Sequence, residues 1–171
     1  MKALLAIGGL AAATAGTMPV RAADGAAVFT QNCLMCHQSG AAGLPGQFPR
    51  LAGRLASISG ASAGRAYLID VLTYGMAGTI TVDDQAIIGL MPPFAQLSNE
   101  DVAGVLSYVQ SLGDPTGGEL RDGQPPAAKP PAAFTAEEVR AGRAKTAKTA
   151  KTATDVRAER HSLEEAKIVA P

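Results

Sequence analysis

Cys33-Leu34-Met35-Cys36-His37 is the stretch that decides the structure of this 171-residue chain. The chain has two cysteines, both within this stretch, and the histidine directly follows the second. Two cysteines are too few for a disulfide-stabilised scaffold or for a four-cysteine zinc site. The 15 basic and 15 acidic residues balance, which argues against nucleic acid as a main partner. The chemistry of the chain is therefore expected to centre on the motif C-x-x-C-H.

This spacing is typical of covalent haem attachment. On one helical turn, Cys33 and Cys36 can each form a thioether bond with a haem vinyl group, and the His37 imidazole then points at the iron. Two alternatives use the same cysteines, a thioredoxin-like redox pair and half of a metal site. A thioredoxin-like pair needs a βαβ context that the sequence does not show. A zinc site needs further ligands, and the other histidine of the chain, His161, lies far into the tail. We therefore predict one covalently attached haem c per chain.

The second axial ligand is sought among Met35, Met76, Met91 and His161. Met35 lies inside the attachment turn and cannot reach the far face of a haem. Met76 follows a helix end, where a methionine that fills a gap in the core is the simpler interpretation. Met91 begins Met-Pro-Pro-Phe, and two prolines stiffen the backbone behind it. Met91 is therefore the predicted ligand opposite His37, which gives the common Met/His pairing.

The N-terminal residues 1–22 have the features of a secretory signal peptide. Lys2 precedes an apolar run from Ala3 to about Ala13, and Val20-Arg21-Ala22 fits a small-x-small cleavage site. We expect cleavage after Ala22 or Ala23. An uncleaved membrane anchor is the alternative, but the apolar run is shorter than the ~20 residues that span a bilayer. The mature protein is therefore expected in an oxidising compartment such as the bacterial periplasm, without a transmembrane anchor.

The remaining chain divides by composition into three regions. Residues 23–113 are apolar and Gly-rich, with few charges. Residues 114–133 form a Pro/Gly-rich stretch that predicts an extended linker. Residues 134–171 are charged and Ala-rich and contain the repeat KTAKTAKTAT. Because this repeat has no clear apolar face, we expect a mobile or marginally helical tail, and a helix docked on a dehydrogenase is the alternative.

Helical signals predominate within residues 23–113. Apolar spacing predicts helices at 24–33, 64–74 and 98–112, the last with a capping box from Ser98 to Asp101 and a stop at Gly113. Residues 79–82 and 86–90 could form strands. A chain that wraps around a planar cofactor is also irregular, so the fold class we predict is all-α. It comprises about three to four helices and long loops around a covalently bound haem, with an extended C-terminal tail.

The region from Asp24 to Leu112 resembles a class I, monohaem cytochrome c domain. The matching pieces, in the expected order, are DGAAVFTQNCLMCH, FPRLAGR, YLIDVLTYGMAGTI and GLMPPFAQLSNEDVAGVLSYVQSL. This region is similar to cytochrome subunits or partners of bacterial periplasmic dehydrogenases that oxidise alcohols, aldehydes or related small substrates. The tail segment FTAEEVR also resembles the ending of such proteins.

The resemblance implies roles for residues outside the motif. Gly25 and Phe29 match first-helix positions that pack against the last helix of the domain, where Tyr108 matches the aromatic partner. These roles coincide with ordinary core packing.

Further roles concern the surroundings of the haem. Pro49 matches the proline whose carbonyl accepts a hydrogen bond from the proximal histidine, here His37. Arg50 and Arg54 are candidates for contacts with haem propionates, and solvated arginines are the equal alternative.

The function implied is transfer of single electrons through a His/Met-ligated haem, without enzymatic chemistry. The expected donor is a periplasmic dehydrogenase, and the expected acceptor is another cytochrome or a terminal oxidase. Two alternatives remain open. The first is a haem protein with an open axial site, acting as an enzyme or a gas-binding protein. The second is a cytochrome subunit held in a dehydrogenase complex by its tail.

Overall fold

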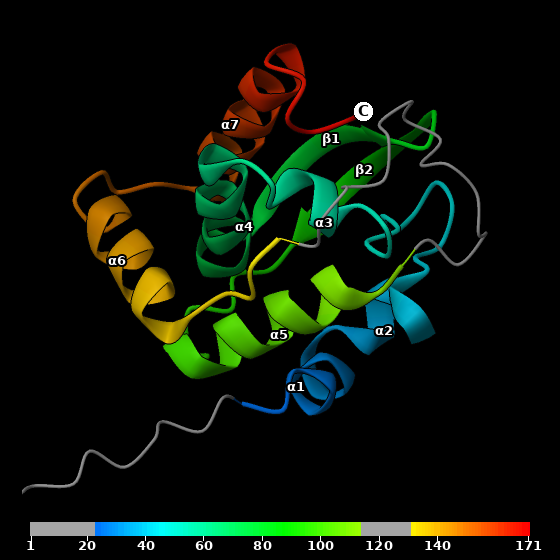
Figure 1. Cartoon of the computed structure of the whole chain (residues 1–171). Helices are drawn as coiled ribbons and strands as arrows, with labels where there is room; N and C mark the ends of the chain where they lie inside the picture. The colour runs from blue at the N-terminus through cyan, green and yellow to red at the C-terminus, as the bar shows by residue number, and fades with distance from the viewer. Residues whose placement is uncertain (1–22, 114–130) are drawn as a thin grey trace, which may run out of the picture.

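Helices form most of the structure, and one hairpin of two strands interrupts them (Figure 1). The structure is a computed structural model that describes residues 23–113 and 131–171. The predicted signal peptide and residues 114–130 of the predicted linker lie outside these residues. In chain order the elements are α1 (Gly25–Asn32), α2 (Leu34–His37), the 3₁₀ turn η1 (Ser39–Ala41), α3 (Leu55–Ile58), α4 (Ser62–Tyr74), β1 (Met76–Val82), β2 (Gln85–Met91), α5 (Asn99–Ser111), α6 (Ala136–Thr146) and α7 (Ala153–Glu165).

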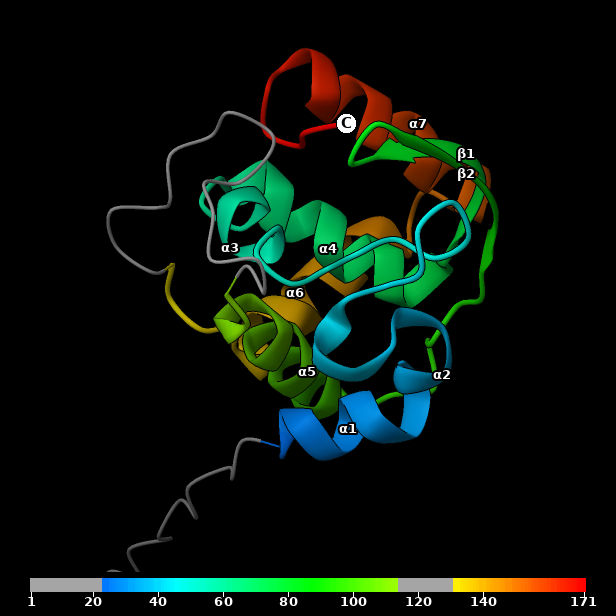
Figure 2. The same ribbon diagram turned by 90° about the vertical axis from the view of Figure 1, so that its right-hand side faces the viewer.

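The first and last helices of the predicted cytochrome domain, α1 and α5, cross in close contact (Figure 2). Asp24 caps α1, because its carboxylate accepts from the backbone N–H groups of the next turn. A Cβ atom at Gly25 would lie 2.1 Å from the carbonyl oxygen of Gly104, so only glycine permits this approach. Beside the crossing, the rings of Phe29 and Tyr108 pack with centroids 5.7 Å apart. The structure thus places these residues together as the family resemblance implies.

Substituting Gly25 with alanine is expected to lower the free energy of unfolding by about 1–3 kcal/mol, because α1 and α5 must separate to admit the methyl group. Guanidinium denaturation of the purified holoprotein measures the change. Gly113→Ala is the control, since no atom lies within 4 Å of its added Cβ. Equal stability of Gly25→Ala and wild type would contradict the close crossing.

The predicted all-α fold class is wrong, because β1 and β2 form an antiparallel hairpin. Register runs from Met76 opposite Met91 to Val82 opposite Gln85. The two-residue turn places Asp83 and Asp84 at positive φ, 52° and 61°, the conformation that a type I′ hairpin turn requires. Aspartate tolerates this conformation better than most residues. The possible strands at 79–82 and 86–90 lie within β1 and β2, which are each longer than the sequence signal indicated.

The C-terminal region differs from the predicted mobile or marginally helical tail. Helices α6 and α7 pack against α4, with α6 also on α5 and α7 also on β1. The buried apolar side chains of these helices and of the residues that flank them belong to the same core cluster as those of α4 and α5; they are Phe134, Val139, Val156, Leu163 and Val169. Local caps start both helices, with Thr135 accepting from the Glu138 N–H and a reciprocal capping box between Thr152 and Asp155. The predicted boundary near residue 113 therefore separates two regions of different composition, but both regions contribute side chains to one hydrophobic core.

Charged groups of the tail also pair with charged groups of α4. Arg65 forms two hydrogen bonds of 2.6 and 2.7 Å with the Glu138 carboxylate, and its guanidinium lies 3.8 Å above the Phe134 ring. Lys151 donates to the carboxylates of Asp70 and Glu159, each at 2.6 Å. The Asp70 side chain is only 3% exposed, so this pair lies in the interior. These contacts connect the tail to the first turn and to the second half of α4.

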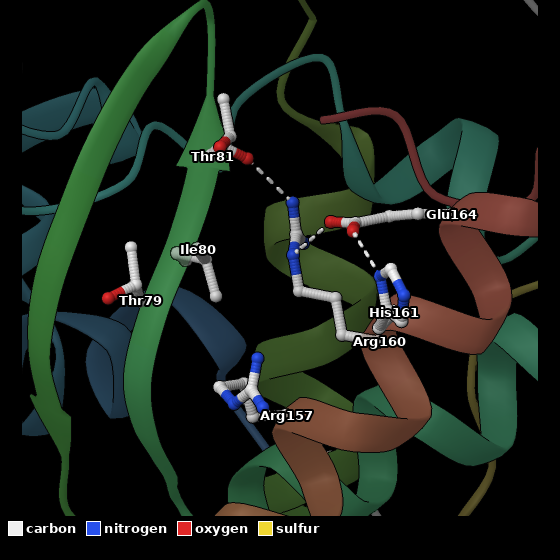
Figure 3. A pocket seen from close by; sticks show the side chains of 7 residues that line it. All are labelled: Thr79, Ile80, Thr81, Arg157, Arg160, His161 and Glu164. Carbon is white, nitrogen blue, oxygen red and sulfur yellow. Dashed lines mark hydrogen bonds and ion pairs between the residues drawn. The ribbon is translucent and has the colours of Figure 1, made fainter.

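A small polar hollow of about 130 Å³ lies between α7 and β1 (Figure 3). Arg160 is buried at its edge, where it donates to the Thr81 carbonyl oxygen at 2.9 Å and forms an ion pair with Glu164. His161 also lines the hollow, but 68% of its side chain is exposed and it faces the carboxylates of Glu164 and Glu165. This places His161 among the surface charges of α7.

Candidate haem-binding site

The C-x-x-C-H motif forms a single helical turn directly after α1. Cys33 lies between the two helices, as the C-cap of α1 and the N-cap of α2. The backbone N–H of His37 donates to the Cys33 carbonyl oxygen at 2.9 Å. Both thiols are free and partly buried. The motif therefore presents two thiols and one imidazole from a rigid turn.

The second half of the motif is oriented by a loop. His37 is 8% exposed, and its Nδ1 lies 3.1 Å from the Pro49 carbonyl oxygen. A carbonyl oxygen can only accept, so Nδ1 carries the proton and Nε2 keeps a lone pair. None of the described residues forms a hydrogen bond with Nε2. Burial lowers the pKa of His37, against the opposing effect of the bond to Pro49, so the neutral, metal-binding form predominates at neutral pH.

A glycine that sequence reasoning missed brings Pro49 to the histidine. Gly43 has a φ of 68°, and its N–H donates to the His37 carbonyl oxygen at 2.8 Å. A Cβ atom here would lie 2.5 Å from the Arg50 nitrogen and 2.6 Å from the Phe48 oxygen. Any other residue would therefore push the 43–50 loop away from His37. The sequence signal was present as a glycine within a Gly/Pro-rich turn, but it did not indicate a specific partner.

Met91 ends β2 and is held from two sides. Its backbone pairs with Met76 across the hairpin, and three residues later the Phe94 N–H donates to the Leu72 carbonyl oxygen of α4 at 2.7 Å. Gly75, with a φ of 72°, lets this segment lie against the end of α4, since a Cβ there would be 2.3 Å from the Met91 carbonyl oxygen. The chain around Met91 is thus fixed in place by backbone contacts. Directly paired residues point to the same face of a sheet, so the Met76 side chain lies beside that of Met91.

Arg50 and Arg54 converge on the tip of the hairpin. Arg50 holds the Asp83 carboxylate through two hydrogen bonds of 2.8 and 2.7 Å. Arg54, whose side chain is 5% exposed, donates to the same carboxylate at 3.2 Å and to the Ala170 carbonyl oxygen at 2.6 Å. These contacts connect the loop after His37, the hairpin turn and the C-terminus. The contacts to haem propionates expected of both arginines stay predictions.

The donor set fits a covalently bound haem better than the two alternatives. Burial raises the pKa of Cys33 to about 11, and the neighbouring Cys36 adds to the effect, whereas redox-active C-x-x-C motifs have lowered thiol pKa values. Among the described residues, no group of three or more histidine, cysteine and acidic side chains could bind a metal ion. Two free thiols, one neutral imidazole and a methionine thioether are instead the kinds of group that attach and ligate haem.

Comparison with known proteins identifies the family. A family model described as cytochrome c oxidase, cbb3-type, subunit III matches residues 20–109, more than half of the chain. One cytochrome c-552 of Thermus thermophilus is 41% identical over 146 residues, 85% of this chain and 86% of that protein. A second cytochrome c-552 of Thermus thermophilus is 43% identical over 124 residues, 72% of this chain and 86% of that protein. The chain therefore belongs to the class I, monohaem cytochromes c, electron-transfer proteins with covalently bound haem c.

Proposed function

We propose that this protein is a periplasmic electron carrier with one haem, attached through Cys33 and Cys36 and ligated by His37 and Met91. The observation that carries the proposal is the His37 ring, which is held by Pro49 through Nδ1 and leaves Nε2 without a hydrogen-bond partner among the described residues. Nε2 is therefore available to ligate iron. The anchored Met91 segment supplies the matching ligand from a different part of the fold.

A haem bound here supplies one-electron exchange between ferric and ferrous iron. His37 and Met91 would hold the iron of a haem bound here, and with both residues bound the chain would leave no coordination site for a substrate. The soft Met91 thioether favours the ferrous state and raises the potential. The hydrogen bond to Pro49 fixes the orientation of the His37 ring and raises its donor strength. Rigid anchoring of both ligands keeps the geometry similar in both oxidation states, which favours rapid transfer.

The partner surface is proposed to lie over the segments that carry the ligands. The large apolar side chains that are exposed in the described part of the chain are Met35, Leu44, Ile88 and Leu90. All four belong to the attachment turn, to the loop that follows it or to β2, which ends at Met91. A small apolar contact of this kind suits transient docking of redox partners. The proposed donor is a periplasmic dehydrogenase, and the proposed acceptor is another cytochrome or a terminal oxidase.

The tail packing argues against the alternative of a subunit held in a dehydrogenase complex by its tail. Val139 and Val156 are fully buried in the protein's own core, so their side chains are not available to a partner. Other surfaces of α6 and α7 remain exposed and polar. Co-purification of a dehydrogenase with the full chain, lost when the exposed charges of α7 are reversed, would revive this alternative.

The visible spectrum of the exported protein in both redox states tests the proposal. We expect a red protein with one haem per chain, resistant to extraction by acid and solvent, and a weak absorption band at the red end in the oxidised state, typical of methionine bound to ferric iron. The Cys33→Ala/Cys36→Ala variant is expected to lose covalently bound haem. Colourless wild-type protein from a host that attaches haem would overturn the proposal.

Export is tested separately by fractionation of the same cells. The proposed signal peptide predicts a periplasmic product whose first residue is Ala23 or Asp24. In the described part of the chain, no helix has the length and hydropathy needed to cross a membrane. A product that stays in the cytoplasm with Met1 intact would contradict export while leaving the site assignment untouched.

A further inference from the structure

Arg143 connects the tail to the segment that follows Met91. From the last turn of α6, its Nη1 donates to the Leu97 carbonyl oxygen at 2.8 Å and to Asn99 Oδ1 at 3.0 Å. Its Nε lies 3.4 Å from the hydroxyl oxygen of Thr73 in the last turn of α4. We infer that Arg143 is a positioning residue for the Met91 ligand, acting through this segment. The inference rests on the ligation proposed above.

The geometry around the ligand segment supports this role. The segment from Met91 to Asn99 contacts α4 at two neighbouring points. Near its start, the Phe94 N–H donates to the Leu72 carbonyl oxygen, and near its end Arg143 bridges it to Thr73. The Arg143 contact therefore fixes the stretch of the segment that lies between the Phe94 contact and the start of α5. A thioether is a weak ligand, so its retention depends on how little freedom the surrounding chain has.

The chemistry of the contact also favours positioning over simple docking of the tail. The described contacts of Arg143 are to a carbonyl, an amide oxygen and a hydroxyl, so no carboxylate is among them. Its Nη2 is buried without a hydrogen-bond partner among the described residues. An incompletely satisfied guanidinium costs folding free energy, and an apolar side chain would dock α6 at least as well. What the guanidinium adds is a directional bond to the backbone of the ligand segment.

Neighbouring contacts hold α6 in register for this bond. Gly142 lies against Ile69 of α4, where an added Cβ would be 3.2 Å from a methyl group. One turn further, the Tyr74 hydroxyl donates to the Thr146 hydroxyl oxygen at 3.0 Å. Arg143 therefore projects from a fixed point on α6, which both views of the fold place beside α4 and α5 (Figures 1 and 2).

The test compares Arg143→Met with Arg65→Met in the haem-loaded protein. Arg65 also secures α6, through Glu138 and the Ala132 carbonyl oxygen, but none of its described contacts reaches residues 91–99. The readout is the affinity of imidazole for the oxidised protein, which competes with Met91 for iron. We expect Arg143→Met to raise this affinity about tenfold, the effect of losing one hydrogen bond to a charged group. We expect Arg65→Met to change it less than about twofold.

Arg143→Lys is expected to restore part of the difference, because an ammonium group can still donate to Leu97. Asn99→Ala removes one of the two acceptors that Arg143 has on the ligand segment and leaves the guanidinium in place. It keeps the test valid if Arg143→Met fails to fold, and it is expected to shift the affinity in the same direction. An unchanged affinity in Arg143→Met, or an equal rise in Arg65→Met, would overturn the inference. A wild-type protein without the methionine–iron absorption band would show that the proposed Met91 ligation itself is wrong. This outcome is distinct from failure of the inference about Arg143, in which the wild-type band is present.

Discussion

Alanine in place of Met91 is expected to lower the reduction potential by on the order of 0.1 V, within the roughly 0.8 V over which axial ligands tune haem proteins. The soft sulfur stabilises the ferrous state, and its loss also opens one side of the iron. The reduced variant is therefore expected to bind carbon monoxide, and the wild-type protein is expected to resist it. Potentiometric titration and a carbon monoxide difference spectrum measure the two effects.

Met76 provides the sharpest control, because it lies directly opposite Met91 in the hairpin register and is also half-buried. Met76→Ala is expected to leave both the potential and carbon monoxide binding close to wild type. Met35→Ala, at a side chain that is 88% exposed in the attachment turn, is a second control. If Met76→Ala has the larger effect, the ligand assignment moves across the hairpin. If wild-type protein itself binds carbon monoxide readily, the alternative of an open axial site is favoured.

Local signals predicted the main helices of the domain correctly. The spacing that predicted a helix at 98–112 is confirmed by α5, and both hydrogen bonds of the capping box form even though Asp101 is shorter than the usual glutamate. Asp24 caps α1 as a helix that starts there requires. These features depend on residues within four positions of one another, so a single sequence contains the information.

The predicted fold class omitted the hairpin although strands at 79–82 and 86–90 were considered, and its turn chemistry is uncommon. Asp83-Asp84 replaces the Asn-Gly or Asp-Gly pair that usually indicates a type I′ turn. Both residues adopt positive φ, and the Asp83 carboxylate is held by Arg50 and Arg54, which lie about thirty positions earlier in the chain. The stabilising partners were therefore visible as residues, but their proximity was not.

The same limit applies to the packing of the tail. The sequence of α6 and α7 offers a few separated apolar residues, too few for an isolated helix to bury a face of its own. The tail is ordered because α4 supplies the complementary groups, notably Arg65 for Glu138 and Asp70 for Lys151. At the haem site, the motif and the prolines predict His37 and Met91 as ligands, and this assignment stays a prediction. The glycines at 43 and 75, which bring loop and ligand segment into place, acquire their meaning only from distant backbone atoms.

Lys151→Met is expected to lower the free energy of unfolding by about 2–4 kcal/mol, because it leaves the buried Asp70 carboxylate without its cation. One oxygen of that carboxylate already has no hydrogen-bond partner in the described structure, so no other group can compensate. Lys148→Met, at an exposed position of the same KTA repeat, is the matched control and is expected to change stability by less than about 0.5 kcal/mol. Thermal or guanidinium denaturation of the holoprotein measures both.

The double variant Asp70→Leu/Lys151→Met separates loss of a charge pair from loss of packing. Because it removes both charges from the interior, it is expected to recover most of the stability lost in Lys151→Met.

The dependence of stability on pH gives an independent check on the role of the Lys151 charge. Burial lowers the pKa of Lys151, but the hydrogen bonds and charges of Asp70 and Glu159 outweigh it, and the pKa is raised from its ordinary value of 10.5. The contribution of Lys151 is therefore complete below about pH 10.5 and is lost as pH rises through the folded-state pKa. The difference in unfolding free energy between wild type and Lys151→Met should therefore stay constant from neutral pH to about pH 10 and shrink above it. A difference that already disappears near neutral pH would mean that the lysine does not hold the tail through its charge.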